Sequence, residues 1–165
     1  MTYLLTFNCY GTHVPGETWG WVERARGNHR GGYQDPSSGL IGYSLAVMKQ
    51  QPYELNMPRA RTVLEAILEV CRFRGWDLLA AHARTTHVHV VASGIPDPDR
   101  AILDFKSYSS RALSRQGFEA PDRKRWAGGG STRTLATTDS IWRAINYVVD
   151  QQGEPMAVYA TASPR

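Results

Sequence analysis

The stretch Trp76–Ala92, WDLLAAHARTTHVHVVA, decides the fold of this chain of 165 residues. Apolar residues dominate its two halves, Trp76–Ala83 and Thr86–Ala92, and Arg84 and Thr85 lie between them. Short apolar runs bounded by polar and turn-forming residues are typical of strands, and a serine, a glycine and a proline follow the second run. We therefore predict an antiparallel hairpin of two strands.

The elements outside this hairpin are predicted from apolar spacing and capping residues. They are a strand at residues 3–10, a helix at 59–74, a helix at 98–116, a strand between 125 and 137, and a last helix that is N-capped by Thr138 or Asp139 and runs to about Gln152. Their order favours a split βαβ arrangement. The predicted fold class is α+β, with a ferredoxin-like antiparallel sheet, helices on one face of it, and a C-terminal helix that carries Tyr147.

Residues 16–50 are the least regular part of the sequence. Glycine is frequent between Gly16 and Gly42, and Pro36 lies in the same segment. Glycine and proline interrupt helices and strands, and a long loop inside a compact domain is usually functional or mobile. We expect a single domain over residues 1–165 with a long irregular loop at about 16–50.

The composition is that of a soluble globular protein, with 42% hydrophobic and 21% charged residues. No apolar run approaches the roughly 20 residues that cross a bilayer, and the first residues lack the features of a signal peptide. The spacing of Cys9 and Cys71 suits neither a zinc site nor a disulfide framework. We expect a cytoplasmic protein that contacts no membrane.

Basic residues are concentrated in one segment. Between Arg100 and Arg143 there are nine basic and four acidic residues, in a chain whose net charge is +4. Such a segment is expected for a polyanion partner such as nucleic acid, although a solvated charged face gives the same pattern. The candidates for contacts with DNA phosphates are Lys106, Arg111, Arg123, Lys124, Arg125 and Arg133.

The sharpest chemical feature is His87-Val88-His89, within the second strand of the hairpin. Side chains alternate along a strand, so the two histidines share a face with Cα atoms roughly 6.6 Å apart, close enough for both imidazoles to reach one cation. Two half-exposed strand histidines without a ligand are the plain alternative. A tight hairpin would also place His82 opposite His87 and make a three-histidine zinc site conceivable.

The last helix carries the second feature. Its apolar residues cluster on one side, whereas Tyr147 and Gln151 lie side by side well away from the centre of that cluster. They are either an exposed pair of no consequence or a nucleophilic phenol beside an amide that can bind a hard metal ion. Tyr108 competes for the role of nucleophile, but its helical position predicts a residue at the border of the core.

Four sequence features occur in the order known from one family. They are the histidine-hydrophobe-histidine strand at 87–89, the helix with the FKS and SR residues at Phe105–Arg111, the segment Trp126–Leu135 with Gly130-Ser-Thr-Arg-Thr-Leu135, and the terminal Tyr147-Val-Val-Asp-Gln151. Over residues 1 to about 159, the chain resembles the HUH single-tyrosine transposases of the insertion sequence 200 kind, which include the REP-associated tyrosine transposases. It departs from many of them at Thr86, where they have Asn or Asp, and in the longer segment after Gly16.

The resemblance implies a ferredoxin-like fold, His87, His89 and Gln151 as ligands of Mg²⁺ or Mn²⁺, and Tyr147 as the nucleophile. In that family the tyrosine attacks a phosphodiester of single-stranded DNA and forms a 5′-phosphotyrosine. The resemblance also implies hairpin-forming repeats as the DNA partner, a homodimer, and a prokaryotic-type, nucleoid-associated location in the cytoplasm.

Two other functions compete with this DNA endonuclease and strand transferase. One is a noncatalytic or domesticated DNA-binding protein of the same fold. The other is a zinc hydrolase that uses His82, His87 and His89 and does not need Tyr147. A covalent adduct between protein and DNA separates the three, because only the tyrosine transposase forms one.

Overall fold

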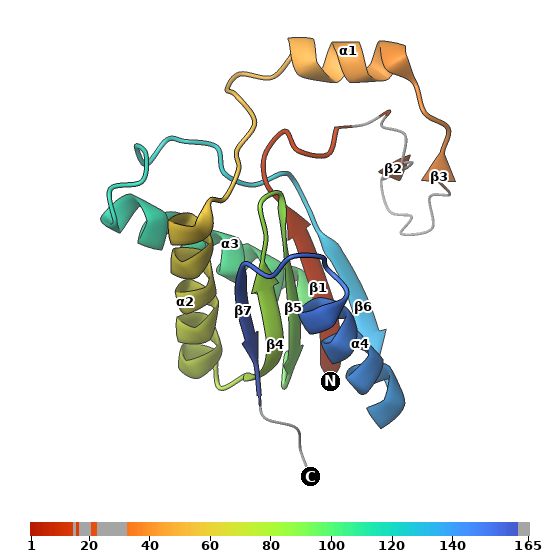
Figure 1. Cartoon of the computed structure of the whole chain (residues 1–165), viewed down its shortest axis with the longest axis vertical. Coiled ribbons are helices and arrows are strands. Elements are labelled where there is room, and N and C mark those ends of the chain that lie inside the picture. The colour runs from red at the N-terminus through yellow and green to blue at the C-terminus, as the bar shows by residue number, and fades with distance from the viewer. Residues whose placement is uncertain (15, 17–20, 23–32, 162–165) are drawn as a thin grey trace.

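The structure of the chain, a computed structural model, describes residues 1–14, 16, 21–22 and 33–161. Five strands form one antiparallel sheet in the order β6-β1-β5-β4-β7 (Figure 1). These strands are β1 (Thr2–Asn8), β4 (Asp77–Ala83), β5 (His87–Ser93), β6 (Ser131–Leu135) and β7 (Ala157–Ala160). The helices are α1 (Ser38–Ala46), α2 (Met57–Arg74), α3 (Pro98–Arg115) and α4 (Thr138–Asp150). A separate pair joins β2 (Trp21–Val22) to β3 (Tyr33–Gln34).

The predicted hairpin is β4 and β5, and the backbone N–H of Arg84 donates to the carbonyl of His87 over 2.9 Å at its turn. The order β1, α2, β4, β5, α3, β6 with the strands arranged 6-1-5-4 is the split βαβ arrangement. The ferredoxin-like α+β fold is therefore confirmed. Sequence reasoning missed β7, a strand of four residues on the outer edge of β4, since so short a run shows little alternation.

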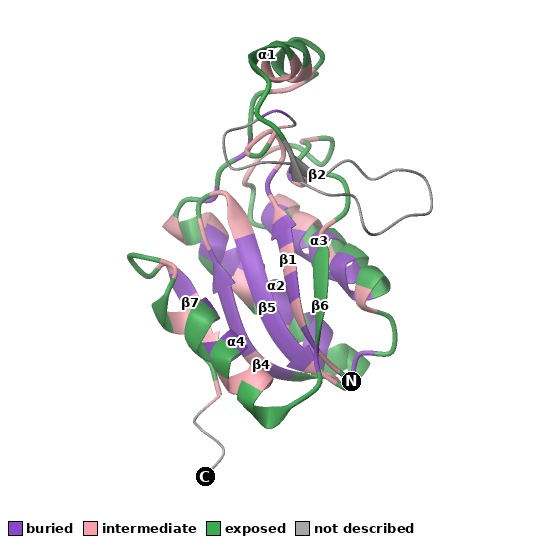
Figure 2. Cartoon of the chain, turned by 90° about the vertical axis from the view of Figure 1, so that its right-hand side faces the viewer, coloured by how far each residue is buried: buried purple, intermediate pink, exposed green. Residues whose placement is uncertain are grey.

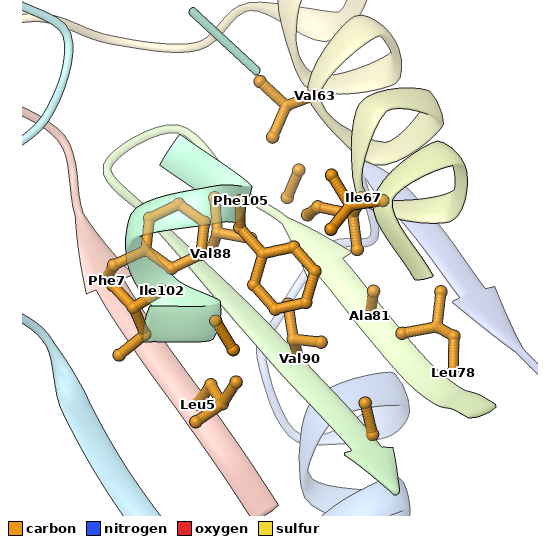
Figure 3. Close-up of a cluster of buried hydrophobic side chains, with 14 of the residues drawn as sticks. Leu5, Phe7, Val63, Ile67, Leu78, Ala81, Val88, Val90, Ile102 and Phe105 are labelled. Atoms are coloured by element: carbon orange, nitrogen blue, oxygen red, sulfur yellow. The ribbon is translucent and has the colours of Figure 1, made fainter. Parts of the chain in front are cut away.

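The main core lies between the sheet and the helices α2 and α3 (Figure 3). Leu5 of β1 and Val88 of β5 face Ile67 of α2 and Phe105 of α3, and all four side chains are fully buried. Burial of such a side chain stabilises the fold by about 1.5–3 kcal/mol. Because alternate residues of β5 fill this core, His87 and His89 point to the opposite face of the sheet.

That opposite face is covered by α4, which packs Ala144, Ile145 and Val148 against Val91 and Leu135. The predicted packing of helices on one face of the sheet therefore holds for α2 and α3, whereas α4 lies on the other face. Figure 2 shows β4 and β5 buried along most of their length between the two layers, while the edge strand β6 is largely exposed. The N-cap of α4 is Thr137, one residue before the earlier of the two predicted caps, and it forms a capping box with Ser140.

The expected irregular loop at 16–50 is only partly irregular, because it contains α1 and the short strands β2 and β3. The side chain of Ser37 caps α1 by accepting a hydrogen bond from the N–H of Leu40. None of the residues of α1 is buried, so the core-facing periodicity that reveals a helix in a sequence is missing. Within 15–32, only residues 16 and 21–22 are described.

Over the described part of the chain, no helix combines the length and the apolar character that a membrane crossing requires.

Candidate active site

The face of the sheet beneath α4 carries a row of polar side chains in register across four strands. Ser131 of β6 pairs with Thr6 of β1, Thr6 pairs with His89 of β5, and His89 pairs with His82 of β4. His87 lies two residues before His89 on the same face. The fold therefore brings together residues from four strands at one end of α4.

His87 and His89 are neighbours whose ring centroids lie 4.7 Å apart at an interplanar angle of 73°. Each ring has a hydroxyl partner for Nδ1: Thr86 Oγ1 at 3.0 Å from His87, and Thr6 Oγ1 at 2.8 Å from His89. A second partner that holds one ring nitrogen is typical of histidines that bind metal through the other. The arrangement leaves the two Nε2 atoms for a shared ligand.

Gln152 supplies the third group, with its side-chain Oε1 lying 3.2 Å from Nε2 of His89. The amide nitrogen of Gln152 also donates to the backbone carbonyl of Tyr147 over 3.1 Å. Gln151, the residue expected at this place, is exposed. The reason for the shift is that α4 ends at Asp150, so Gln151 adopts non-helical angles and the four-residue helical spacing from Tyr147 no longer applies. Gln152, and not Gln151, therefore lies beside His89 in the structure.

His82 has a structural role. It lies opposite His89, not opposite His87 as the three-histidine hypothesis requires. Its Nδ1 lies 2.9 Å from the carbonyl oxygen of Val148, and its Nε2 accepts from the N–H of Met156 over 3.2 Å. Both ring nitrogens are therefore used to hold α4 and the segment before β7 on the sheet, and the zinc site of three histidines is not formed.

The geometry of His87, His89 and Gln152 suits a divalent cation. With metal–nitrogen bonds of about 2.1 Å, two imidazoles at roughly 90–110° around one ion have ring centroids about 4.5–5.3 Å apart. The observed 4.7 Å falls in this range. A carbonyl oxygen such as Gln152 Oε1 is a ligand that Mg²⁺ and Mn²⁺ accept, and water or phosphate oxygens complete their octahedral shell.

Burial keeps these histidines neutral. Desolvation, with a smaller contribution from the nearby His87, lowers the pKa of His89 from 6.5 to about 4. Desolvation also lowers the pKa of His87, and the charge of Arg84 acts on both rings in the same direction. Neutral imidazoles can bind a metal ion at physiological pH without first releasing a proton.

Tyr147 lies beside this cluster in the same chain. Its ring centroid is 5.4 Å from that of His89, at an interplanar angle of 69°, and 40% of its surface is exposed. The hydrophobic side of α4 faces the sheet, which leaves Tyr147 at the edge of the packed face, where a substrate can reach its hydroxyl. Tyr108 instead lies on α3, across the sheet, against Phe73 and Arg111.

A groove of about 650 Å³ opens from Tyr147 and His89 along the face of the sheet between β6 and α4. Ser131 and Arg133 line it from β6, and Ser140 and Arg143 line it from α4. Arg133 is thus the one predicted DNA-binding residue that lies beside the candidate nucleophile. Sequence reasoning missed Arg143, which lies four residues before Tyr147 on α4.

Three of the predicted DNA-binding residues have structural roles. Lys106 is 8% exposed, and its ammonium group donates to the backbone carbonyls of Ala127 and Gly129. Arg125 is 2% exposed and donates to Ser114. Arg123 holds residues 50–52 through the side chain of Gln50 and two backbone carbonyls. A local excess of basic residues in the sequence cannot distinguish cations that hold the fold together from cations that are available to a partner.

Arg111 and Lys124 are exposed, and neither of them lines the groove beside Tyr147 and His89. The guanidinium of Arg111 lies 4.4 Å from the ring centre of Tyr108 on α3, and the ammonium of Lys124 lies 5.6 Å from that of Tyr10. The structure therefore brings together His87, His89, Tyr147 and Arg133 of the predicted site residues. It adds Gln152, Thr6 and Arg143, of which Thr6 could be found only from the register between β1 and β5.

Comparison with known proteins yields a structural match. No protein-family model matches the chain, and no curated protein matches it. A solved structure of a REP-associated tyrosine transposase bound to a REP hairpin is similar, with a TM-score of 0.53 and 14% sequence identity. The match covers 91% of this chain, which spans 65% of the length of that protein. Likeness at this identity shows the fold alone, and it agrees with the five-stranded, ferredoxin-like α+β sheet described above.

Proposed function

We propose that this protein is a metal-dependent endonuclease and strand transferase that acts on single-stranded DNA, as transposases of the HUH type do, with Tyr147 as its nucleophile. The observation that carries the proposal is the convergence of Tyr147, His87, His89 and Gln152 within one chain. The fold shared with a REP-associated tyrosine transposase supports it independently.

The reaction is a transesterification at phosphorus. The phenol oxygen of Tyr147 forms a bond to the phosphorus of a DNA phosphodiester, and the bond from phosphorus to the 3′ oxygen breaks. The phenol proton passes to solvent and the departing 3′ oxygen takes up a proton, which leaves a 5′-phosphotyrosine and a free 3′-hydroxyl. One ester replaces another, so a 3′-hydroxyl can reverse the step and rejoin a strand without a nucleotide cofactor.

The chain supplies the positions that this step needs. His87, His89 and Gln152 would hold Mg²⁺ or Mn²⁺, and Thr6 and Thr86 would orient the two imidazoles through their Nδ1 atoms. A bound divalent ion supplies a Lewis acid that polarises the phosphate and neutralises charge at the departing oxygen. The hydrogen bond from Gln152 to the backbone of Tyr147 ties the metal ligands to the nucleophile.

The proposed partner is single-stranded DNA next to a hairpin-forming repeat, since the similar solved protein is bound to a REP hairpin. Tyr147 and the histidines belong to one chain here, so a homodimer, which the family resemblance implies, would not be needed to complete the site. We place the protein, on the same resemblance, in a prokaryotic cytoplasm at the nucleoid.

The test is formation of a covalent adduct. The protein is incubated with hairpin oligonucleotides that carry random single-stranded flanks, in MnCl₂, MgCl₂ or EDTA, and analysed on denaturing gels. We expect an adduct with either metal, none in EDTA, and none with His89→Ala. DNA binding without any adduct would show instead a noncatalytic DNA-binding protein of this fold.

A further inference from the structure

The groove between β6 and α4 extends from the candidate active site in one direction, which the strand register defines. In the register of β1 and β5, Asn8 pairs with His87, Thr6 with His89 and Leu4 with Val91. Leu4 also pairs with Arg133 and lines the groove. The groove therefore extends past His89 in the direction away from His87. Gln152 lies just after the C-terminal end of α4, opposite to the first turn of that helix.

The groove presents positive charge and hydroxyl groups. Arg133 is exposed and has no ion-pair partner among the residues that the structure describes. Arg143 pairs with Asp139, and both side chains of this pair are mostly exposed. An exposed ion pair of this kind contributes little to stability, so a phosphate can compete with the carboxylate of Asp139 for the guanidinium of Arg143. Ser131 and Ser140 add hydroxyls to the same walls.

Arg143 is also well placed relative to the nucleophile. It precedes Tyr147 by four residues on α4, which places the two on one side of the helix about 6 Å apart along its axis. Arg133 reaches the same groove from the opposite wall. Two guanidinium groups thus face a space that begins at the hydroxyl-bearing tyrosine, the arrangement expected for consecutive phosphates of one strand.

From this geometry we infer that the groove binds the nucleotide on the 3′ side of the scissile phosphate, with Arg133 and Arg143 contacting the next phosphate of that strand. The inference rests on the proposed function. In an in-line displacement the tyrosine oxygen and the departing 3′ oxygen lie on opposite sides of phosphorus, and the departing oxygen would lie on the side of His87, His89 and Gln152, the residues that would hold the cation. The strand that stays attached to Tyr147 then runs into the groove.

This assignment gives Arg133 and Arg143 a role in positioning. They would hold the strand with the 5′-phosphate in place after cleavage, while the strand with the free 3′-hydroxyl can leave and be exchanged. A lysine at either place would keep the charge but lose the paired hydrogen bonds that a guanidinium makes to phosphate.

The test measures binding without chemistry. Tyr147→Phe protein in EDTA is titrated, by fluorescence anisotropy, with labelled random tetranucleotide pools that carry either a 5′-phosphate or a 3′-phosphate. We expect tighter binding of the 5′-phosphorylated pool, which mimics the attached strand. Arg133→Gln and Arg143→Gln should each weaken that binding about tenfold and reduce the slope of log affinity against log salt by about 0.7.

Arg111→Gln is the matched control, because it removes the same charge from an exposed helix position on the far face of the sheet. It should leave the affinity for the 5′-phosphorylated pool unchanged. Equal binding of the two pools, or equal losses in all three arginine variants, would overturn the inference. Failure of the catalytic proposal is distinguishable, since it would abolish the covalent adduct while the 5′-phosphate preference and its dependence on Arg133 and Arg143 remained.

Discussion

The side-chain oxygen of Gln152 lies 3.2 Å from Nε2 of His89, although 63 positions separate the two residues. The same glutamine donates to the backbone carbonyl of Tyr147. Because His89 is held from its other nitrogen by Thr6, the imidazole has one orientation and one nitrogen left for a ligand. The pair therefore defines where a cation would be bound and links that place to the candidate nucleophile.

Replacement of Gln152 by Ala should weaken the binding of Mn²⁺ at least about tenfold, because one of the three proposed protein ligands is removed. Gln151→Ala is the matched control and should bind Mn²⁺ like the unchanged protein, since its side chain is exposed. Isothermal titration calorimetry gives both affinities. A loss of affinity in Gln151→Ala alone would show that α4 continues through Gln151 and that Gln151 is the ligand.

His82→Ala should destabilise the fold by about 2–4 kcal/mol without a loss of Mn²⁺ affinity. The substitution leaves the carbonyl of Val148 and the N–H of Met156 without their partner in a buried place. Urea unfolding measures the stability, and calorimetry on the folded variant measures the affinity. If stability were kept and metal binding lost, His82 would be a ligand and the three-histidine hypothesis would be restored.

Lys106→Met should lower the free energy of unfolding by about 1–3 kcal/mol, because the carbonyls of Ala127 and Gly129 lose the donor that the buried lysine supplies. The affinity of the folded variant for single-stranded DNA should stay within about twofold, since the ammonium group is not at the surface. Unfolding in urea and anisotropy titrations check the two outcomes. An undiminished stability with a smaller salt slope would return Lys106 to the DNA-binding surface.

In EDTA the protein should lose stability as the pH falls from about 6.5 to about 4. The pKa of His89 is about 4 in the folded protein and 6.5 when unperturbed, and the pKa values of His82 and His87 are also lowered. The unfolded chain therefore binds more protons in this window, and protonation favours unfolding. Thermal unfolding against pH measures the effect. A double variant, His87→Ala with His89→Ala, should show a smaller dependence, and an identical dependence would contradict the assignment.

The sequence predicted the ferredoxin-like sheet because its deciding strands are strongly apolar and end at clear turn signals, as in the hairpin of β4 and β5. It also predicted that His87 and His89 share a face of their strand and that Tyr147 lies away from the centre of the apolar face of its helix, because strand alternation and helical spacing locate these side chains without tertiary information. Gln152 could not be predicted, because its position depends on where α4 ends. The burial of Lys106 and Arg125 depends on the fold of residues 119–129, which no periodic pattern reports.

The most direct test of the account is to map the residue that carries DNA. An adduct formed in MnCl₂ is digested with protease and nuclease, and mass spectrometry locates the remaining nucleotide. We predict a nucleotide 5′-phosphate on Tyr147, and no adduct in Tyr147→Phe, a variant that keeps the ring and its packing against His89. Tyr108→Phe should form the adduct normally. A nucleotide on Tyr108, or an undiminished adduct in Tyr147→Phe, would contradict the assignment of Tyr147 as the nucleophile.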